Sequence, residues 1–201
     1  MRSYAKTQTV CPPFHGEIRG KDIGVTKASR YAGKHYVYRI MASPVGELKL
    51  VASDDGLAAI LWDNDRPDRV PLPIIAKDES HPILLETARQ LRDYFAGERQ
   101  AFDLPLDFSG TEFQRKVWQA LLAIPFGETR TYSQIAAEIG ASKAIRAVGA
   151  ANGRNPISII APCHRVIGSA GDLRGFAGGL ERKVYLLQLE GTETKAFDFA
   201  A

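Results

Sequence analysis

The spacing of apolar residues changes along the chain, and this change restricts the fold more than any other sequence feature. In residues 35–62 apolar and polar residues alternate, with turn signals at Ser43–Pro44 and at 54–56. Alternation of this kind predicts β-hairpins with one buried face. From Pro82 onward apolar residues recur every three or four positions, which is typical of amphipathic helices. The sequence therefore predicts an α+β fold whose first part is rich in strands and whose last part is mostly helical.

The pattern divides the chain into two units, residues 35–108 and residues 109–191. In the first unit we expect a proline-rich loop after residue 66, a helix within 81–98 and one more strand within 101–110. With 201 residues, of which 45% are hydrophobic, the chain has enough apolar material for buried cores.

The two ends of the chain lack such patterns. Residues 1–34 show no sustained period and contain Pro-Pro, glycine and basic residues, so we expect an extension that is partly disordered, and 192–201 form a short tail. There is no membrane-length apolar run, and the N-terminus lacks the apolar core of a signal peptide. The two cysteines, Cys11 and Cys163, cannot build a disulfide framework, and no Cys and His cluster has zinc-site spacing. We expect a cytoplasmic protein (nuclear if the source is eukaryotic) with no cofactor, no metal and no membrane contact.

A pair of short helices around a glycine predicts a helix-turn-helix. The first helix ends at Gly140, and the second begins after Ser142, a candidate N-cap, and runs to Gly153. Arg146 would point away from the buried face that Val148 marks. Many helical hairpins in protein cores share this pattern, so it leaves DNA binding open.

Basic residues gather in the second unit. Residues 111–191 contain ten Lys or Arg against six Asp or Glu, whereas residues 35–110 contain eight against thirteen. This asymmetry fits an anionic partner for the second unit, and ordinary scatter of surface charge fits it equally well.

Cys163 follows an apolar run, residues 157–162, that predicts a buried strand or extended segment. Pro162 stiffens the approach to the cysteine, and His164 and Arg165 bring positive charge directly after it. Because positive surroundings lower the pKa of a thiol, and the thiolate is the nucleophile, this context favours a reactive cysteine. An inert core cysteine is the common alternative, and the residues alone leave both open.

A histidine that accepts a thiol proton becomes charged and needs an acid to orient it. His164 can reach Cys163 in a tight turn but not within a strand. Glu190, at the end of an apolar helix, is the candidate acid, although spacing alone favours a solvated glutamate there. The five glycines in residues 168–179 let a ligand approach the backbone closely, so this loop is either a pocket wall or a flexible surface loop.

Four stretches together resemble the active-site half of a known family. "NPISIIAPCHRVIG" is followed by "RGFAGGLERKVYLLQLEG", and "PFGETRTYSQIAAEIG" and "AIRAVGAANGRNP" precede them at the family's spacing. In these stretches the chain resembles the O6-alkylguanine-DNA alkyltransferases, also called methylated-DNA–protein-cysteine methyltransferases, to which the "PCHRV" core is highly specific. The resemblance covers about residues 36–191. It implies a ribonuclease-H-like α/β domain followed by a winged-helix-like domain that carries the helix-turn-helix.

The resemblance implies DNA repair by direct reversal, with flipping of O6-alkylguanine or O4-alkylthymine and irreversible, stoichiometric alkyl transfer to Cys163. His164 resembles the base that removes the thiol proton through a water, and Glu190 the acid that orients this base. Asn155 resembles the hinge between the recognition helix and the active-site loop. Tyr132 resembles the tyrosine that helps to turn out the nucleotide and protonates the leaving guanine.

The resemblance also implies a monomer that binds double-stranded DNA through the minor groove with low sequence specificity. Arg146 resembles the arginine that fills the space left by the flipped nucleotide. The other implied DNA contacts are Tyr132, Ala147, Gly149, Arg154 and Arg165. The implied substrate pocket consists of Val166, Phe176, Ala177 and Gly178.

Phe176–Ala177 departs from the Tyr-Ser that some members carry, so two hydroxyl groups are missing and the pocket wall is more apolar. This leaves reactivity toward bulky O6 adducts open. One alternative is an alkyltransferase-like protein, which binds the lesion without repairing it, but such proteins replace the acceptor cysteine. A helix-turn-helix regulator with Cys163 in its core is a second alternative. A cysteine hydrolase is a third, and it would need a distant histidine, yet His15, His35 and His81 have no supporting context.

Overall fold

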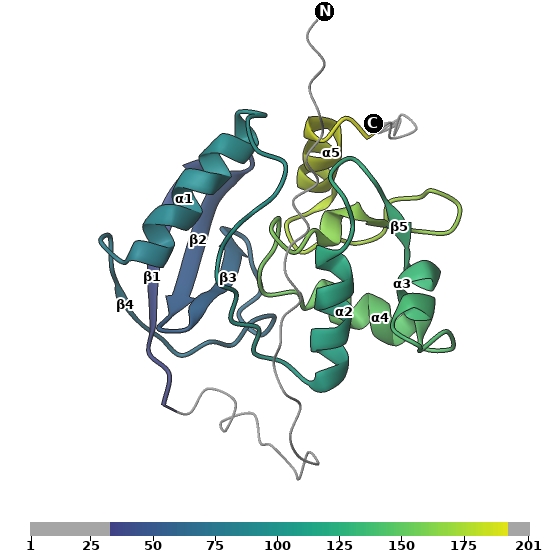
Figure 1. The fold of residues 1–201 in the computed structure, drawn as a ribbon, viewed down its shortest axis with the longest axis horizontal. Coiled ribbons are helices and arrows are strands. Elements are labelled where there is room, and N and C mark those ends of the chain that lie inside the picture. The colour runs from purple at the N-terminus through teal and green to yellow at the C-terminus, as the bar shows by residue number, and fades with distance from the viewer. Residues whose placement is uncertain (1–32, 193–201) are drawn as a thin grey trace, which may run out of the picture.

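The computed structural model describes residues 33–192 (Figure 1). The predictions for the extension 1–34, with Cys11, and for the tail 192–201 therefore lie almost wholly outside the described residues. The elements, in chain order, are β1 (Tyr36–Ser43), β2 (Gly46–Ser53), β3 (Gly56–Trp62), β4 (Ile74–Lys77), α1 (Pro82–Phe95), α2 (Glu112–Leu122), β5 (Arg130–Thr131), α3 (Tyr132–Glu138), α4 (Ile145–Gly153), β6 (Val166–Ile167) and α5 (Leu180–Leu189). The predicted α+β class is confirmed: a sheet with α1 forms the N-terminal domain, and a mostly helical C-terminal domain follows it.

The N-terminal sheet has the strand order β3-β2-β1-β4. The two predicted hairpins are confirmed, since β1, β2 and β3 pair in antiparallel fashion. β4 lies inside the predicted proline-rich loop and pairs parallel to β1, which the sequence did not indicate. The strand predicted within 101–110 was wrong: Leu106 makes only an isolated bridge to Leu57, because the preceding Pro105 has no N–H to extend a ladder.

The core of the N-terminal domain lies between the sheet and α1. Leu50 and Ile60 from the sheet and Leu84 and Leu91 from α1 are completely buried in one cluster. Leu186 of α5 is buried in the same cluster, so the last helix of the chain packs into the N-terminal domain. Residues of both domains therefore contribute to this cluster.

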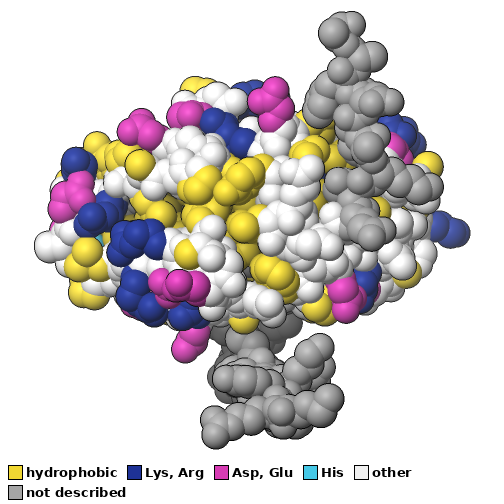
Figure 2. Space-filling model, turned by 90° about the horizontal axis from the view of Figure 1, so that it is seen from above, with side chains coloured by type: hydrophobic (Ala, Val, Ile, Leu, Met, Phe, Trp, Pro, Cys, Tyr) yellow, Lys and Arg dark blue, Asp and Glu magenta, His cyan; other side chains and the backbone are white. Residues whose placement is uncertain are grey.

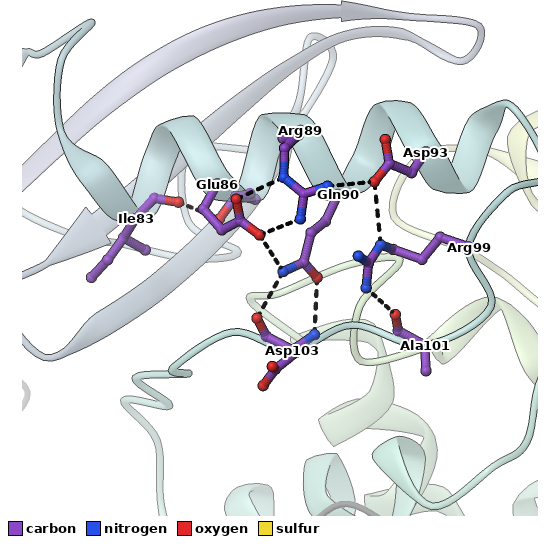
Figure 3. A network of polar contacts seen from close by, with 9 residues as sticks. Ile83, Glu86, Arg89, Gln90, Asp93, Arg99, Ala101 and Asp103 are labelled. Carbon is purple, nitrogen blue, oxygen red and sulfur yellow. Dashed lines mark hydrogen bonds and ion pairs between the residues drawn. The ribbon is translucent and has the colours of Figure 1, made fainter. Parts of the chain in front are cut away.

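A polar network fixes the chain that leaves α1 (Figure 3). The Gln90 side chain donates to the Asp103 carbonyl at 2.7 Å and accepts from the Asp103 N–H at 2.9 Å. Arg99 donates to the Ala101 carbonyl at 2.8 Å, and Arg89 bridges Glu86 and Asp93 along the exposed side of the helix. The linker segment 98–103 forms no helix or strand of its own, and these bonds hold it against α1.

Helices α2 and α3 of the C-terminal domain begin at reciprocal side-chain caps. Thr111 caps α2, where its hydroxyl accepts from the Gln114 N–H at 3.2 Å and the Gln114 side chain accepts from the Thr111 N–H at 2.9 Å. Thr131 and Gln134 form the same reciprocal cap on α3.

The predicted helix-turn-helix is present as α3 and α4, which pack against each other and against α2. Gly140 makes the turn with φ +71°, a conformation that favours glycine. The cap predicted at Ser142 was wrong: α4 starts at Ile145 after Ala144, which makes no side-chain cap.

The apolar run before Cys163 is buried, as predicted, but it does not form a strand. Ile157 alone pairs, in a bridge with Ile60 of β3, and the residues after it follow turns in which Ile159 has φ +73°. The Ile60 N–H also donates to the Pro156 carbonyl at 2.9 Å. This edge of the sheet therefore anchors the segment that leads into Cys163. Within residues 33–192, no helix is long and apolar enough to cross a membrane.

We predict that Gly56→Ala destabilises the protein. A Cβ at Gly56 would lie 2.6 Å from the Pro105 carbonyl oxygen, and this contact is with backbone that cannot rotate away. We expect a loss of about 1–3 kcal/mol in the free energy of unfolding, measured by urea denaturation. Gly153→Ala is the matched control because nothing lies within 4 Å of a Cβ there. An equal loss in both variants would contradict the steric explanation.

Candidate active site

Cys163 lies in a tight 3-10 turn, Cys163–Arg165, rather than at the end of a strand. Its side chain is buried, with 3% of the residue exposed. Burial raises the pKa of the Cys163 thiol above its ordinary value, and an interaction with Asn155 and the charges of Arg69 and Lys183 offset this only in part. The direction is opposite to the one that positive sequence neighbours suggested. The isolated thiol is therefore protonated at neutral pH and needs a base.

Asn155 holds the turn that carries the cysteine. Its side-chain amide donates to the Ala161 carbonyl at 2.7 Å, and its side-chain oxygen accepts from the Ile157 N–H at 3.1 Å. Arg69, buried in the proline-rich loop of the N-terminal domain, donates to the Asn155 carbonyl. Asn155 thus connects the end of α4, the Cys163 segment and the N-terminal domain.

His164 is completely buried and hydrogen-bonds through Nε2 to Glu190 Oε1 at 2.8 Å. A carboxylate only accepts, so Nε2 carries the hydrogen and Nδ1 keeps its lone pair. Nδ1 is buried and has no hydrogen-bond partner among the described residues. Burial lowers the pKa of the imidazole below its ordinary value, although Glu190 raises it. His164 is therefore a neutral base with a free Nδ1.

Glu190 is buried, although spacing alone favoured a solvated side chain. Its Oε1 also accepts from the Tyr94 hydroxyl at 2.7 Å, and Arg165 donates to both of its oxygens at 2.7 and 2.9 Å. Burial alone would raise the pKa of this carboxyl, but the hydrogen bonds from His164 and Arg165 outweigh it and lower the pKa to about 2. Glu190 is therefore charged at any physiological pH.

Arg165 lies inside the protein, with 6% of the residue exposed. Its guanidinium is occupied by Glu190 and by the Ile124 carbonyl, which accepts from Nη1 at 2.6 Å. This position is inconsistent with the DNA contact predicted for Arg165. The buried carboxylate explains the difference, because an unpaired Glu190 would be costly inside the protein.

Lys183 is a site residue that the sequence reasoning missed. It is completely buried, and its Nζ donates to the Val166 carbonyl at 2.6 Å and to the Arg174 carbonyl at 3.2 Å. Burial lowers the pKa of this amine to about 8, although the Cys163 thiolate would raise it. A lysine on the apolar stripe of α5, three residues before Leu186, was the available signal. Tyr94 and Arg69, by contrast, had no local signal.

The predicted DNA-contact residues other than Arg165 lie on and beside α4. Arg146, Ala147 and Arg154 are exposed, and Gly149 is half-buried. The Tyr132 ring of α3 lies over Gly149, 3.9 Å from the position of a Cβ. Burial, and then the charge of the Cys163 thiolate, raises the pKa of the Tyr132 hydroxyl. Figure 2 shows another face, the top of the view in Figure 1, where basic and acidic side chains lie side by side around an apolar area.

Two of the predicted pocket residues pack in or against the apolar cluster that contains Cys163. Val166 is completely buried and belongs to the same apolar cluster as Cys163, and half-buried Phe176 packs against that cluster. Ala177 is half-buried, and Gly178 is buried. Among residues 33–192, no three His, Cys, Asp or Glu side chains come together as metal ligands.

Two family models match the chain. The model described as "6-O-methylguanine DNA methyltransferase, ribonuclease-like domain" matches residues 36–108, and "6-O-methylguanine DNA methyltransferase, DNA binding domain" matches residues 112–192.

Curated relatives and solved structures agree with these matches. The methylated-DNA–protein-cysteine methyltransferase of Methanosarcina acetivorans is 49% identical over 77% of this chain and 98% of its own length. That of Mycobacterium leprae is 50% identical over 76% of this chain and 90% of its own. The crystal structure of Mycobacterium tuberculosis OGT in complex with DNA is similar with a TM-score of 0.69 and 47% identity, over 78% of this chain and 92% of that one. The chain therefore belongs to the family of methylated-DNA–protein-cysteine methyltransferases.

Proposed function

We propose that this protein repairs O6-alkylguanine in double-stranded DNA by moving the alkyl group to Cys163. The observation that carries the proposal is the buried pair of His164 and Glu190, which leaves a neutral imidazole with a free Nδ1 one residue from a protonated thiol. A structural cysteine would need neither a base nor a carboxylate beside it.

In the proposed reaction, His164 Nδ1 takes the Cys163 proton through a bridging water, and Glu190 stabilises the imidazolium that results. The thiolate attacks the alkyl carbon on O6, so a carbon–sulfur bond forms as the carbon–oxygen bond breaks. The electron pair of the broken bond stays on the guanine, which takes a proton from the Tyr132 hydroxyl and leaves as normal guanine. The thioether is stable, so each chain acts once.

We assign DNA binding to α3 and α4. The relative from M. tuberculosis has been crystallised with DNA, and a family model described as a DNA binding domain matches residues 112–192. α4 enters the minor groove, where Ala147 and Gly149 allow close approach and Arg154 contacts phosphate. Arg146 fills the space of the extruded nucleotide and offsets an extrusion cost of a few kcal/mol. Binding has low sequence specificity because contacts to the phosphate backbone do not read bases.

The remaining parts of the proposal concern scope and assembly. Thymine alkylated at O4 presents the same alkyl–oxygen bond, so it is a second substrate. Residues 35–108 and 109–191 act as the two domains of a monomer, with the substrate pocket formed by Val166, Phe176, Ala177 and Gly178. The presence of Cys163 speaks against a lesion-binding protein without transfer activity, and its base speaks against a plain regulator.

Incubation with a duplex that contains one O6-methylguanine should add one methyl group to each chain, measured as intact mass. Cys163→Ala should gain nothing because the acceptor sulfur is gone. Cys11→Ala, which removes the other cysteine of the chain, is the matched control and should gain one methyl group. Fresh, reduced wild-type protein that stays unmodified would refute the proposed function.

Glu190→Gln should slow methyl transfer by about 10- to 100-fold, because an amide does not stabilise the imidazolium of His164. Affinity for the same duplex should not change. Glu190→Gln leaves the Arg165 guanidinium without its charged partner and thereby destabilises the fold, so transfer rates are measured well below the melting temperature of the variant. Tyr94→Phe, which removes one hydrogen-bond donor and keeps the carboxylate, should slow transfer less. Equal losses of transfer and DNA affinity would make Glu190 a structural residue.

The wild-type rate should stay level as the pH falls from 8 toward 6.5 and should decrease only below this value. Transfer needs neutral His164, and its pKa lies below the ordinary 6.5 in the folded protein. Stopped-flow measurement of the transfer rate between pH 5 and 8 checks this. A decrease that begins above pH 7 would contradict a neutral buried base.

Arg146→Ala should slow repair in duplex DNA by about tenfold, since extrusion of the nucleotide then lacks a compensating side chain. Its rate with free O6-methylguanine base should be unchanged. Arg89→Ala, an exposed arginine on α1, is the matched control for removal of one positive charge. A slower reaction with both substrates would mean that Arg146 is needed for folding rather than for extrusion of the base.

A further inference from the structure

Trp62, at the end of β3, touches the predicted substrate pocket although it belongs to the N-terminal domain. Its ring meets the Phe176 ring edge-on, with 5.4 Å between centroids and an interplanar angle of 64°. Edge-to-face geometry of this kind is attractive and directional. Trp62 is almost fully buried, with 3% exposed, so the ring has little room to move.

Gly178 allows this contact. A Cβ on Gly178 would lie 2.8 Å from two atoms of the Trp62 ring and 3.1 Å from the Phe176 ring. The backbone after Phe176 therefore passes directly against the tryptophan, and only glycine fits there. Phe176 itself packs against both the N-terminal core cluster, which includes Trp62, and the cluster that includes Cys163.

Arg182 of α5 contacts both the Trp62 ring and the backbone of Gly178. Its guanidinium lies over the Trp62 ring, 5.4 Å from the centroid, in a cation–π arrangement. Arg182 also donates to both Asp63 oxygens at 2.8 and 2.9 Å, to Asn64 at 2.9 Å and to the Gly178 carbonyl at 3.2 Å. Asp63 and Asn64 directly follow Trp62, so one side chain ties the end of β3 to the glycine-rich loop.

The geometry points to Trp62 as a positioning residue that sets the size of the O6 substituent the pocket accepts. This inference rests on the proposed alkyl transfer and adds a specificity determinant to it. Trp62 acts through Phe176: the indole fills the space into which the phenyl ring would have to retreat to admit a larger group. Arg182 keeps the indole and the loop together. The N-terminal domain thereby limits the substrate range of a pocket in the C-terminal domain.

Trp62→Leu removes the ring and leaves space behind Phe176. It breaks no hydrogen bond of the indole, because Trp62 Nε1 has no partner among the described residues. We expect the ratio of the O6-benzylguanine rate to the O6-methylguanine rate, in the same duplex, to rise by about 10-fold. Trp62→Phe should restore most of the wild-type ratio. The measurement is the second-order rate constant of adduct formation, followed by intact mass.

Arg182→Gln is the second variant, and it tests the inference even if Trp62→Leu does not fold. The Arg182 side chain is partly exposed, and the ratio of the benzyl rate to the methyl rate should also rise in this variant. Arg89→Gln, which removes an arginine that bridges two acids on α1, is the matched control and should keep the wild-type ratio. A purely structural role of Trp62 would lower both rates in proportion. An unchanged ratio in folded Trp62→Leu and Arg182→Gln would overturn the inference.

Hydrogen exchange gives a readout that does not depend on transfer. The amides of residues 174–179 should exchange faster in Trp62→Leu and Arg182→Gln than in the wild type and in Arg89→Gln. Unchanged exchange would also overturn the inference. Wild-type protein that transfers no methyl group, yet shows faster exchange in the variants, would instead refute the proposed function while the positioning contact stands.

Discussion

The rest of the site depends on the hydrogen bonds that the buried Glu190 carboxylate accepts. It lies in the interior and accepts hydrogen bonds from Tyr94 of the N-terminal domain and from His164 and Arg165 of the cysteine turn. A buried charge is stable only when its partners are in place, so these three side chains cannot be moved independently. The same carboxylate fixes the tautomer of His164 and hence the direction from which a proton can be accepted.

The N-terminal domain contributes to the site without carrying the reactive groups. Besides Tyr94, it supplies Arg69, which holds the carbonyl of Asn155, and the β3 edge, which pairs with Ile157. These contacts fix the backbone that leads into the cysteine turn. Helices α3 and α4 remain free of them, which leaves one face of the C-terminal domain for a large ligand.

Sequence reasoning succeeded where the information is local. The alternation that predicts β1 to β3, the periodicity of α1 and the Gly140 turn all depend on near neighbours. It failed where distant partners decide. The run before Cys163 is apolar enough for a strand. Only Ile157 pairs, in a bridge with Ile60, and the residues after it form turns. Likewise, the resemblance implied a DNA contact for Arg165, because nothing in its neighbourhood shows that its guanidinium binds the buried Glu190, 25 residues away.

The raised pKa of Cys163 has a consequence for the proposed reaction, in which each chain acts once. A buried, protonated thiol reacts slowly with peroxide and with small electrophiles, since the thiolate is the reactive form. In the proposed reaction the thiol is activated by His164, which is enclosed in the same interior, so soluble oxidants do not meet a charged sulfur. The protein can therefore persist in its reduced state until a damaged base is presented. In the proposed reaction, burial of the cysteine therefore preserves the single transfer for the lesion.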